Sequence, residues 1–268
     1  MMALKVEIND KTYEAEKGEY ILEACRRNNI TIPTLCHHEG INGIGSCRLC
    51  VVEINEGNGS KVVASCVYPL GKDCTIFTES EKIKNIRKTI LSMLKARAPE
   101  GKRLSDLCQL YGVEEDGRFT IGKTGSGKSG KKSPAQKRLE SSCILCGICT
   151  QACVKLGTGA ISTVSRGVTK KVSTPFDEPS ADCIGCGSCA AVCPTGAIEC
   201  TESGGNRTIW GRKFRLINCA SCSRAFATEE EYSLSLKNAG VSNLPVLCEI
   251  CRRKGSAAPF AAAFGERV

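Results

Sequence analysis

The chain has 268 residues, 20 of them cysteine, with 5% aromatic residues and a formal net charge of +9 at pH 7. Cysteine at this density is typical of secreted disulfide scaffolds, yet the opening residues Met1 to Glu7 contain no apolar signal region, so we expect a reduced, cytoplasmic protein. No apolar run approaches the roughly 18 residues needed to cross a bilayer, which argues against direct membrane insertion. The low aromatic content indicates that metal centres, rather than one large apolar core, hold much of the chain together.

The net charge does not by itself predict nucleic-acid binding. Metal-bound cysteines are thiolates, and a tetrathiolate site carries about −2 once its metal is counted, so four such sites would bring the +9 to roughly +1. The basic excess is also local, because it is concentrated between Arg118 and Arg138. We therefore expect a solvated or docking loop there and no nucleic-acid partner, and we keep a cluster- and zinc-containing nucleic-acid-binding module as an alternative.

The first predicted elements are a β-hairpin and a helix. Apolar and polar residues alternate over residues 4–15 and break at Asn9-Asp10, which predicts two antiparallel strands joined by a turn. A short helix is expected over residues 20–28, before Pro33 ends the next extended piece. A further strand is expected over residues 61–64.

Four cysteines in this region have the spacing C-x10-C-x2-C-x15-C. They are Cys36, Cys47, Cys50 and Cys66. Four thiolates suit one [2Fe-2S] cluster, although the spacing departs from the plant-type pattern. Gly40, Gly43 and Gly45 lie between the first two, where missing side chains would let backbone N–H groups approach the cluster sulfurs. His37 and His38 adjoin the set, but a Rieske centre needs two histidines beside two cysteines, and four cysteines already complete this one.

The next segment, residues 81–141, is expected to be a helical and basic connector. Residues 122–129 within it satisfy the phosphate-loop pattern G-x4-G-K-[ST]. A working phosphate loop leads into an amphipathic helix, whereas the polar run Gly130 to Pro134 follows here. We expect a Gly/Ser/Lys connector, and a P-loop ATPase that uses its clusters as sensors stays as an alternative.

Eight cysteines then repeat the spacing C-x2-C-x2-C-x3-C twice, and Pro194 follows the second run. In the bacterial ferredoxin pattern, the first three thiolates of each run hold one cubane and the fourth binds the other. The first [4Fe-4S] cluster is therefore assigned to Cys143, Cys146, Cys149 and Cys193. The second is assigned to Cys153, Cys183, Cys186 and Cys189. Disulfides or zinc would require other spacings.

The last part is expected to contain a third kind of metal site. After a loop-like break at residues 201–206, a basic strand is predicted from Trp210 to Ile217 and a helix from Thr228, its cap, to Asn238. Two C-x2-C pairs separated by 25 residues supply Cys219, Cys222, Cys248 and Cys251. This pattern is typical of a zinc ribbon or treble clef; we favour one Zn²⁺ as a structural staple, while a further [4Fe-4S] cluster also fits four thiolates.

Four more cysteines have no partner at metal-site spacing, and we interpret them as packing residues. They are Cys25, Cys74, Cys108 and Cys200.

Several stretches resemble the amino-terminal iron-sulfur region of the large Fe-S subunit of bacterial NADH:quinone oxidoreductase, of NAD-linked [FeFe]-hydrogenases and of NAD-dependent formate dehydrogenases. They are Ile32 to His37, Gly45 to Glu53, Ala64 to Leu70, Thr78 to Ser80, Gly117 to Phe119, and the paired cysteine runs through Ala197. The resemblance implies a ferredoxin-like β-grasp fold for the first 80 or so residues. We expect an α+β protein with a [2Fe-2S] ferredoxin-like domain at 1–80, the connector at 81–141, a two-[4Fe-4S] ferredoxin domain at 142–205, and a four-cysteine metal module and tail at 206–268.

The chain also departs from this family. Many relatives carry a third cubane, held by one histidine and three cysteines, in the stretch corresponding to residues 90–112, where this sequence has only Cys108. We expect no counterpart here of their large carboxy-terminal catalytic domains.

These features together predict an electron-transfer subunit of a cytoplasmic, hetero-oligomeric oxidoreductase, with no catalytic residues of its own. Its expected cofactors are one [2Fe-2S] cluster, two [4Fe-4S] clusters and one Zn²⁺. The resemblance implies two partners. One is a flavin-containing NAD(P)H dehydrogenase subunit, and the other is a catalytic subunit such as a hydrogenase, a formate dehydrogenase or a tungsten or molybdenum enzyme.

Overall fold

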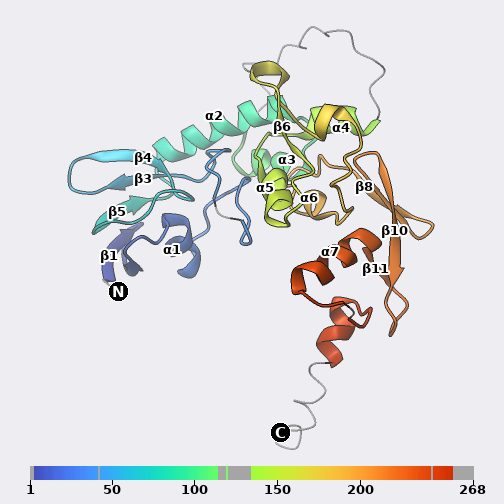
Figure 1. The fold of residues 1–268 in the computed structure, drawn as a ribbon. Coiled ribbons are helices and arrows are strands. Elements are labelled where there is room, and N and C mark those ends of the chain that lie inside the picture. Colours follow the sequence, from blue (N-terminus) through green and yellow to red (C-terminus); the bar gives the residue numbers. More distant parts are fainter. Residues whose placement is uncertain (1–2, 42, 114–118, 120–133, 243, 256–268) are drawn as a thin grey trace, which may run out of the picture.

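A computed structural model describes residues 3–41, 43–113, 119, 134–242 and 244–255 of the chain (Figure 1). The predicted phosphate-loop pattern at residues 122–129 and the tail from residue 256 lie outside the described residues. Among the described residues, no helix has both the length and the apolar character needed to span a membrane.

Two sheets stand at opposite ends of the molecule, with the helices of the cubane region between them (Figure 1). The strands are β1 (Ala3–Ile8), β2 (Lys11–Glu16), β3 (Val51–Asn55), β4 (Ser60–Ala64), β5 (Cys74–Phe77), β6 (Ser162–Val164), β7 (Lys171–Ser173), β8 (Cys200–Ser203), β9 (Asn206–Ile209), β10 (Arg212–Asn218) and β11 (Ala225–Thr228). The helices are α1 (Ile21–Arg27), α2 (Glu81–Arg97), α3 (Lys102–Leu110), α4 (Pro134–Ser142), α5 (Ile148–Lys155), α6 (Ser188–Ala191) and α7 (Glu229–Ala239), with 3-10 turns η1 (Gly167–Thr169) and η2 (Pro175–Asp177). Residues 249–255 are also helical.

The amino-terminal sheet has five strands in the order β2-β1-β5-β3-β4, with β1 and β5 parallel and the other pairs antiparallel. The predicted hairpin is confirmed: Asn9 and Asp10 adopt φ of 48° and 65°, the left-handed pair that a two-residue hairpin turn favours. The helix predicted over residues 20–28 and the strand predicted over residues 61–64 are also present, as α1 and β4. Helix α1 packs its buried side chains, among them Ile21 and Leu22, into the core of this sheet. This mixed sheet around one helix is the arrangement that a β-grasp domain requires.

The described part of the connector that contains α2 and α3 is packed into the fold. Ser80 caps α2 by accepting the Ile83 N–H, and α2 and α3 pack against each other. Their buried side chains join one apolar core with residues from both iron-sulfur regions. Its members include Leu35, Cys36, Leu49, Leu91, Leu104, Cys108, Ile144, Cys146 and Ile148. The amino-terminal and cubane regions are therefore held together by a shared core as well as by the chain.

The internal repeat in the sequence is also a repeat in the backbone. Gly147 and Gly187 both adopt left-handed φ, 81° and 75°, immediately before helices α5 and α6. Two residues earlier, Leu145 and Gly185 are also left-handed, with φ of 55° and 66°. Both cysteine runs therefore follow the same looping path into a short helix, which aims their thiols inward.

The carboxy-terminal sheet has the order β11-β10-β9-β8 and corrects one expectation. Residues 201–206 are not a loop-like break: Gly204 and Gly205, with φ of 55° and 71°, form only a tight turn between β8 and β9. A second turn lies at Trp210-Gly211, so the predicted basic strand starts at Arg212 and not at Trp210. The domain boundary expected between residues 205 and 206 falls within the β8–β9 turn. Strand β8, on one side of it, pairs with β9 on the other side and belongs to the same sheet.

Candidate metal centres

The four cysteines predicted to hold a [2Fe-2S] cluster converge in the interior of the amino-terminal region. Cys36, Cys47, Cys50 and Cys66 are all buried. The sulfurs of Cys50 and Cys66 lie 3.3 Å apart, and the Cys47 N–H donates to the Cys36 sulfur at 3.3 Å. Hydrogen bonds from the neighbouring thiols lower the pKa of Cys36 to about 2 and the pKa of Cys50 to about 6. The same hydrogen bonds, together with burial, raise the pKa of Cys47 and of Cys66. Two of the four thiols are therefore ready to ionise, and a bound cationic group is needed to make all four thiolates.

Two of the three glycines in this loop meet a steric requirement. A Cβ at Gly43 would lie 2.3 Å from the Cys66 carbonyl oxygen, so only glycine allows this approach of the two ligand segments. Gly45 has a φ of +66° and faces Val67. Gly40 meets no such constraint, since its nearest neighbour would be His38 at 3.6 Å.

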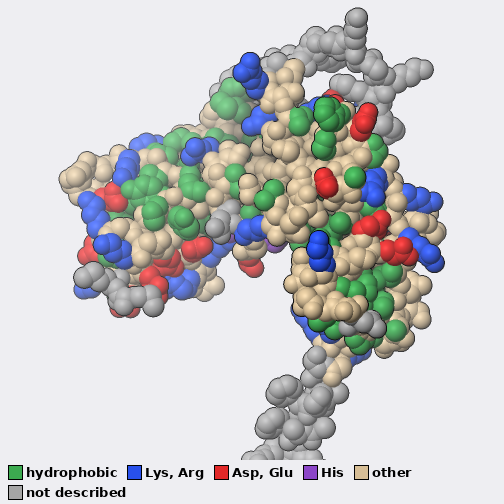
Figure 2. All heavy atoms as spheres, in the orientation of Figure 1, with side chains coloured by type: hydrophobic (Ala, Val, Ile, Leu, Met, Phe, Trp, Pro, Cys, Tyr) green, Lys and Arg blue, Asp and Glu red, His purple; other side chains and the backbone are tan. Residues whose placement is uncertain are grey.

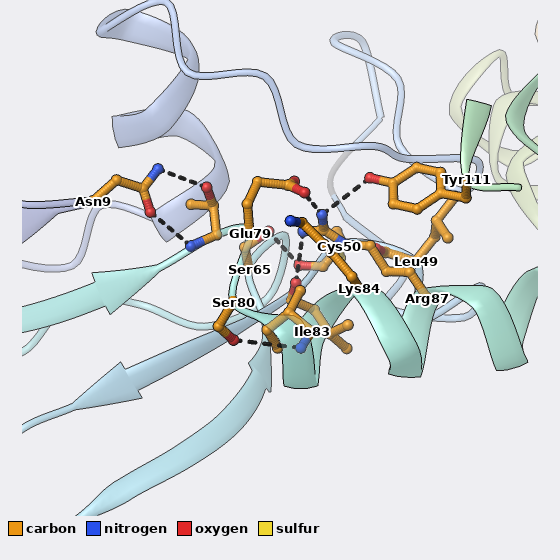
Figure 3. A network of polar contacts seen from close by, with 12 residues as sticks. Asn9, Leu49, Cys50, Ser65, Glu79, Ser80, Ile83, Lys84, Arg87 and Tyr111 are labelled. Carbon is orange, nitrogen blue, oxygen red and sulfur yellow. Dashed lines mark hydrogen bonds and ion pairs between the residues drawn. The ribbon is translucent and has the colours of Figure 1, made fainter.

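A fully buried arginine fixes the ligand segment around Cys50 (Figure 3). Arg87 of α2 donates from Nε to the Leu49 carbonyl at 3.2 Å and from a terminal nitrogen to the Val51 carbonyl at 2.9 Å. Its other terminal nitrogen contacts Glu79 and the Tyr111 hydroxyl. The carbonyl between them, on Cys50 itself, accepts from the backbone and hydroxyl of Ser65 at 3.1 and 2.8 Å. Three successive carbonyls are thus held, which orients the thiol of Cys50.

The two histidines beside Cys36 have other partners. His37 Nδ1 lies 3.0 Å from a guanidinium nitrogen of Arg26, and His38 Nδ1 accepts the Gly40 N–H at 3.2 Å. Burial and the nearby Arg26 lower the pKa of His37. These contacts favour the interpretation of a polar loop over that of a Rieske centre.

The first predicted cubane set lines one cavity of about 330 Å³. Cys143, Cys146, Cys149 and Cys193 all border it, so the cysteine of the second run lies with the three of the first. Part of this space is open to solvent. The four sulfurs do not meet the spacing that a single metal ion requires, which suits a polyatomic group better than a single ion. Burial raises the pKa of Cys146 to about 12, so these thiols need the positive charge of a bound metal group to ionise.

The second set lines a separate cavity of about 340 Å³. Cys153, Cys183, Cys186 and Cys189 border it, together with Trp210. The Thr158 hydroxyl lies 3.1 Å from the Cys153 sulfur, and the Trp210 indole N–H donates to the Cys189 sulfur at 3.4 Å. Burial raises the pKa of Cys189 to about 12, as in the first cavity.

The [2Fe-2S] site and the first cavity are direct neighbours. The Ser46 hydroxyl donates to the Leu145 carbonyl at 3.4 Å, and Lys155 donates to the Gly40 carbonyl at 2.9 Å. The first contact joins the loop between Cys36 and Cys47 to the cysteine run that begins at Cys143, and the second joins this loop to the end of α5, two residues after the run. Cofactors at the two sites would therefore be separated only by these ligand loops.

The sulfurs of the carboxy-terminal four-cysteine set lie at the spacing of a single-ion site. The sulfurs of Cys219, Cys222, Cys248 and Cys251 all lie within 4.8 Å of one another, and those of Cys222 and Cys248 are 3.7 Å apart. Four thiolates around zinc, each with a bond of about 2.3 Å, are separated by about 3.8 Å. Within the described part of the chain, no other group of His, Cys, Asp or Glu meets this single-ion spacing. The Cys248 N–H lowers the pKa of Cys219 to about 6.

The remaining cysteines pack as expected. Cys25 and Cys74 are buried in the amino-terminal core, and burial raises their pKa values to about 12 and 11. Cys108 is buried in α3, and Cys200 is half-buried beside Gly187.

Comparison with known proteins agrees with this geometry. A 2Fe-2S iron-sulfur cluster binding domain matches residues 2–81, and a 4Fe-4S dicluster domain matches residues 142–197. The chain is 35% identical over 216 residues to the NADP-reducing hydrogenase subunit HndD of Solidesulfovibrio fructosivorans. It is 31% identical over 205 residues to the NADH-ubiquinone oxidoreductase 75 kDa subunit of Reclinomonas americana. The chain is thus similar to iron-sulfur subunits of NAD(P)-linked oxidoreductases.

The family resemblance seen in the sequence is thus confirmed. The matches cover 74% and 73% of this chain but only 36% and 29% of the two relatives. A chain from the crystal structure of an NAD+-reducing [NiFe]-hydrogenase in the H2-reduced state is similar with a TM-score of 0.58 and 26% identity, over 72% of this chain and 85% of that one. The α+β chain contains a [2Fe-2S] domain followed by a [4Fe-4S] dicluster domain.

The sequence analysis missed the residues that hold the ligand loops from outside. Arg87 was one of many basic residues, although an arginine at helical spacing between Ile83 and Leu91, both buried, was a usable signal. Arg212 and Trp210 carried no comparable signal, because their partners lie 21 to 32 residues away in the chain.

We predict that Gly43→Ala removes most of the [2Fe-2S] cluster and leaves both cubanes in place, because the new Cβ forces the Cys66 segment away. Gly40→Ala is the matched control, since its nearest contact of 3.6 Å is ordinary packing. Electron paramagnetic resonance (EPR) of the dithionite-reduced variants measures each cluster. A full [2Fe-2S] signal in Gly43→Ala would show that the close approach is not required.

Proposed function

We propose that this chain is an electron-transfer subunit that relays single electrons through three iron-sulfur clusters. The observation that carries the proposal is the grouping of twelve buried or half-buried cysteines into three sets, two of which line separate cavities. Each bound cluster accepts and releases one electron. The residues of the chain exclude water, fix the thiolates and supply N–H donors to the sulfurs. No histidine, lysine or carboxylate side chain lines either of the two cavities, and we assign the chain no substrate chemistry.

We assign the [2Fe-2S] cluster to Cys36, Cys47, Cys50 and Cys66. The first cubane is assigned to Cys143, Cys146, Cys149 and Cys193, and the second to Cys153, Cys183, Cys186 and Cys189. The lining of the two cavities supports this crossed assignment, because each contains three cysteines of one run and the fourth of the other.

We assign Cys219, Cys222, Cys248 and Cys251 to one Zn²⁺. The sulfur separations of no more than 4.8 Å support a single ion. In a cubane each thiolate binds a different iron at a corner of the cube, which holds the four sulfurs farther apart. The zinc would close the loop that contains α7 and act as a structural staple.

The partners are proposed from the relatives. One relative is named as a subunit of an NADP-reducing hydrogenase and another as a subunit of an NADH-ubiquinone oxidoreductase. We propose that this chain works in a cytoplasmic hetero-oligomer, between a flavin-containing NAD(P)H dehydrogenase subunit and a catalytic subunit such as a hydrogenase, a formate dehydrogenase or a tungsten or molybdenum enzyme. On the face shown in Figure 2, basic and acidic side chains of the described residues are intermingled, which gives this face no single basic surface for nucleic acid.

We predict that the anaerobically purified full chain holds about ten iron, about ten sulfide and about one zinc. Dithionite should reduce its clusters, while the chain alone should not oxidise NADH, hydrogen or formate. Elemental analysis and anaerobic absorbance spectra measure both properties. About fourteen iron without zinc would contradict the zinc assignment, and substrate oxidation by the chain alone would contradict the relay.

We predict that Cys193→Ala damages the first cubane, whose other three ligands lie roughly 45 residues earlier in the chain. Cys200→Ala, a nearby packing cysteine, should keep both cubanes. Mössbauer and EPR spectra distinguish the two clusters. Loss confined to the cluster of Cys183, Cys186 and Cys189 would disprove the crossed assignment.

A further inference from the structure

The carboxy-terminal sheet holds the ligand loop of the second cubane site from outside. Arg212 of β10 places one terminal nitrogen 2.8, 2.9 and 2.8 Å from the carbonyl oxygens of Ser180, Ala181 and Cys183. All three carbonyls belong to the segment that leads into the loop. A single guanidinium thus fixes the direction in which the chain enters the Cys183 ligand position.

The next two carbonyls of the loop are held by the same sheet. The Thr228 hydroxyl at the end of β11 donates to the Ile184 carbonyl, and Arg207 of β9 donates to the Gly185 carbonyl at 2.9 Å. Arg207 is itself oriented by Glu202 at 2.8 Å and Glu231 at 3.6 Å. Nearly every carbonyl between residues 180 and 185 therefore has a donor that comes from residues 207–228.

An aromatic side chain completes this contact. Phe214 is almost fully buried, and its ring lies where a Cβ of Gly185 would be, at only 2.5 Å. The guanidinium carbon of Arg212 sits 4.7 Å from the centre of the same ring. The loop can approach the sheet this closely only because residue 185 is glycine.

Trp210 makes the one direct contact from this sheet to a ligand sulfur among the described residues. Its indole N–H donates to the Cys189 sulfur at 3.4 Å, and its side chain borders the second cavity. Trp210 has a φ of 51°, a conformation that a bulky residue rarely adopts and that Gly211 helps to form in the β9–β10 turn. The fold thus tolerates backbone strain that places this N–H at the cluster ligand.

We propose that residues 200–251 form a brace for the second cubane, in which Trp210, Arg207 and Arg212 are positioning residues that raise its reduction potential. The proposal rests on the proposed function, because it requires a cluster at Cys153, Cys183, Cys186 and Cys189. A reduced cluster carries one more negative charge than an oxidised one. N–H donors to its sulfurs and nearby guanidinium groups therefore favour the reduced state.

The four-cysteine site anchors this brace. Cys219 directly follows β10, and the Ala220 N–H donates to the Val246 carbonyl at 2.8 Å, next to Cys248. A metal ion that joins Cys219 to Cys248 would fix the end of the strand that carries Arg212. The metal would thus act on the second cubane through the sheet, without being part of the electron path.

The test uses the full chain with all clusters loaded. Trp210→Phe removes the N–H donor and keeps an aromatic ring, and Arg212→Met removes the guanidinium and keeps most of the apolar stem. Arg215→Met is the matched control, because Arg215 lies on the same strand with a side chain that is 78% exposed. EPR-monitored redox titration gives the potential of each cluster, and iron analysis checks that the clusters are present.

We expect Trp210→Phe and Arg212→Met to shift the potential of the second cubane to more negative values, while the first cubane, the [2Fe-2S] cluster and the Arg215→Met variant stay unchanged. If Arg212→Met loses the second cubane and keeps the other clusters, that result also supports the proposal, because Arg212 holds the segment that leads into the Cys183 ligand position. An unchanged second potential in Trp210→Phe, or equal shifts at both cubanes, would overturn the proposal. A wild-type chain that binds no cubanes would instead disprove the proposed function.

Discussion

The need to bury thiolates controls this structure. Burial raises the pKa of Cys146 and of Cys189 to about 12, so a bound group with positive charge would be needed to make thiolates favourable in each cavity. Because the cysteine pattern is crossed, the two cubane sites depend on each other. Each cubane cavity takes one cysteine from the other run, so neither can form until both runs are in place.

The shared apolar core connects the cubane region to the amino-terminal domain. Leu35 and Leu49 next to the [2Fe-2S] ligands, Leu91 of the connector and Ile144 beside the first cubane pack in one cluster of buried side chains. Arg87 adds a polar link from α2 to the carbonyls around Cys50. This packing supports a continuous route in which the [2Fe-2S] cluster lies beside the first cubane, and it argues against a loosely tethered side branch.

The sequence was most informative where chemistry fixes spacing. The cysteine intervals led to the predicted cubane and zinc ligands, since a cubane or a tetrahedral ion accepts few arrangements of thiolates. The hairpin at Asn9-Asp10 and the Thr228 cap were also predictable, because both depend on neighbours within a few residues. The β8–β9 hairpin was missed, because Gly204-Gly205 in a polar stretch fits a loop as well as a turn between two four-residue strands. Contacts such as Arg212 to Ser180 were not predictable, since they depend on how separate segments pack.

The central claim is that the [2Fe-2S] cluster and the first cubane are neighbours on one electron path. EPR of the fully reduced chain tests it most directly, because two reduced clusters in close proximity broaden and split each other's signals. The reference spectra come from Gly43→Ala, which should lose the [2Fe-2S] cluster, and Cys193→Ala, which should lose the first cubane. We predict that the [2Fe-2S] signal is broadened or split in the wild-type chain and takes the form of an isolated cluster in Cys193→Ala, while Gly43→Ala gives the signals of the two cubanes alone. A wild-type spectrum equal to the sum of the separate cluster signals would contradict the account.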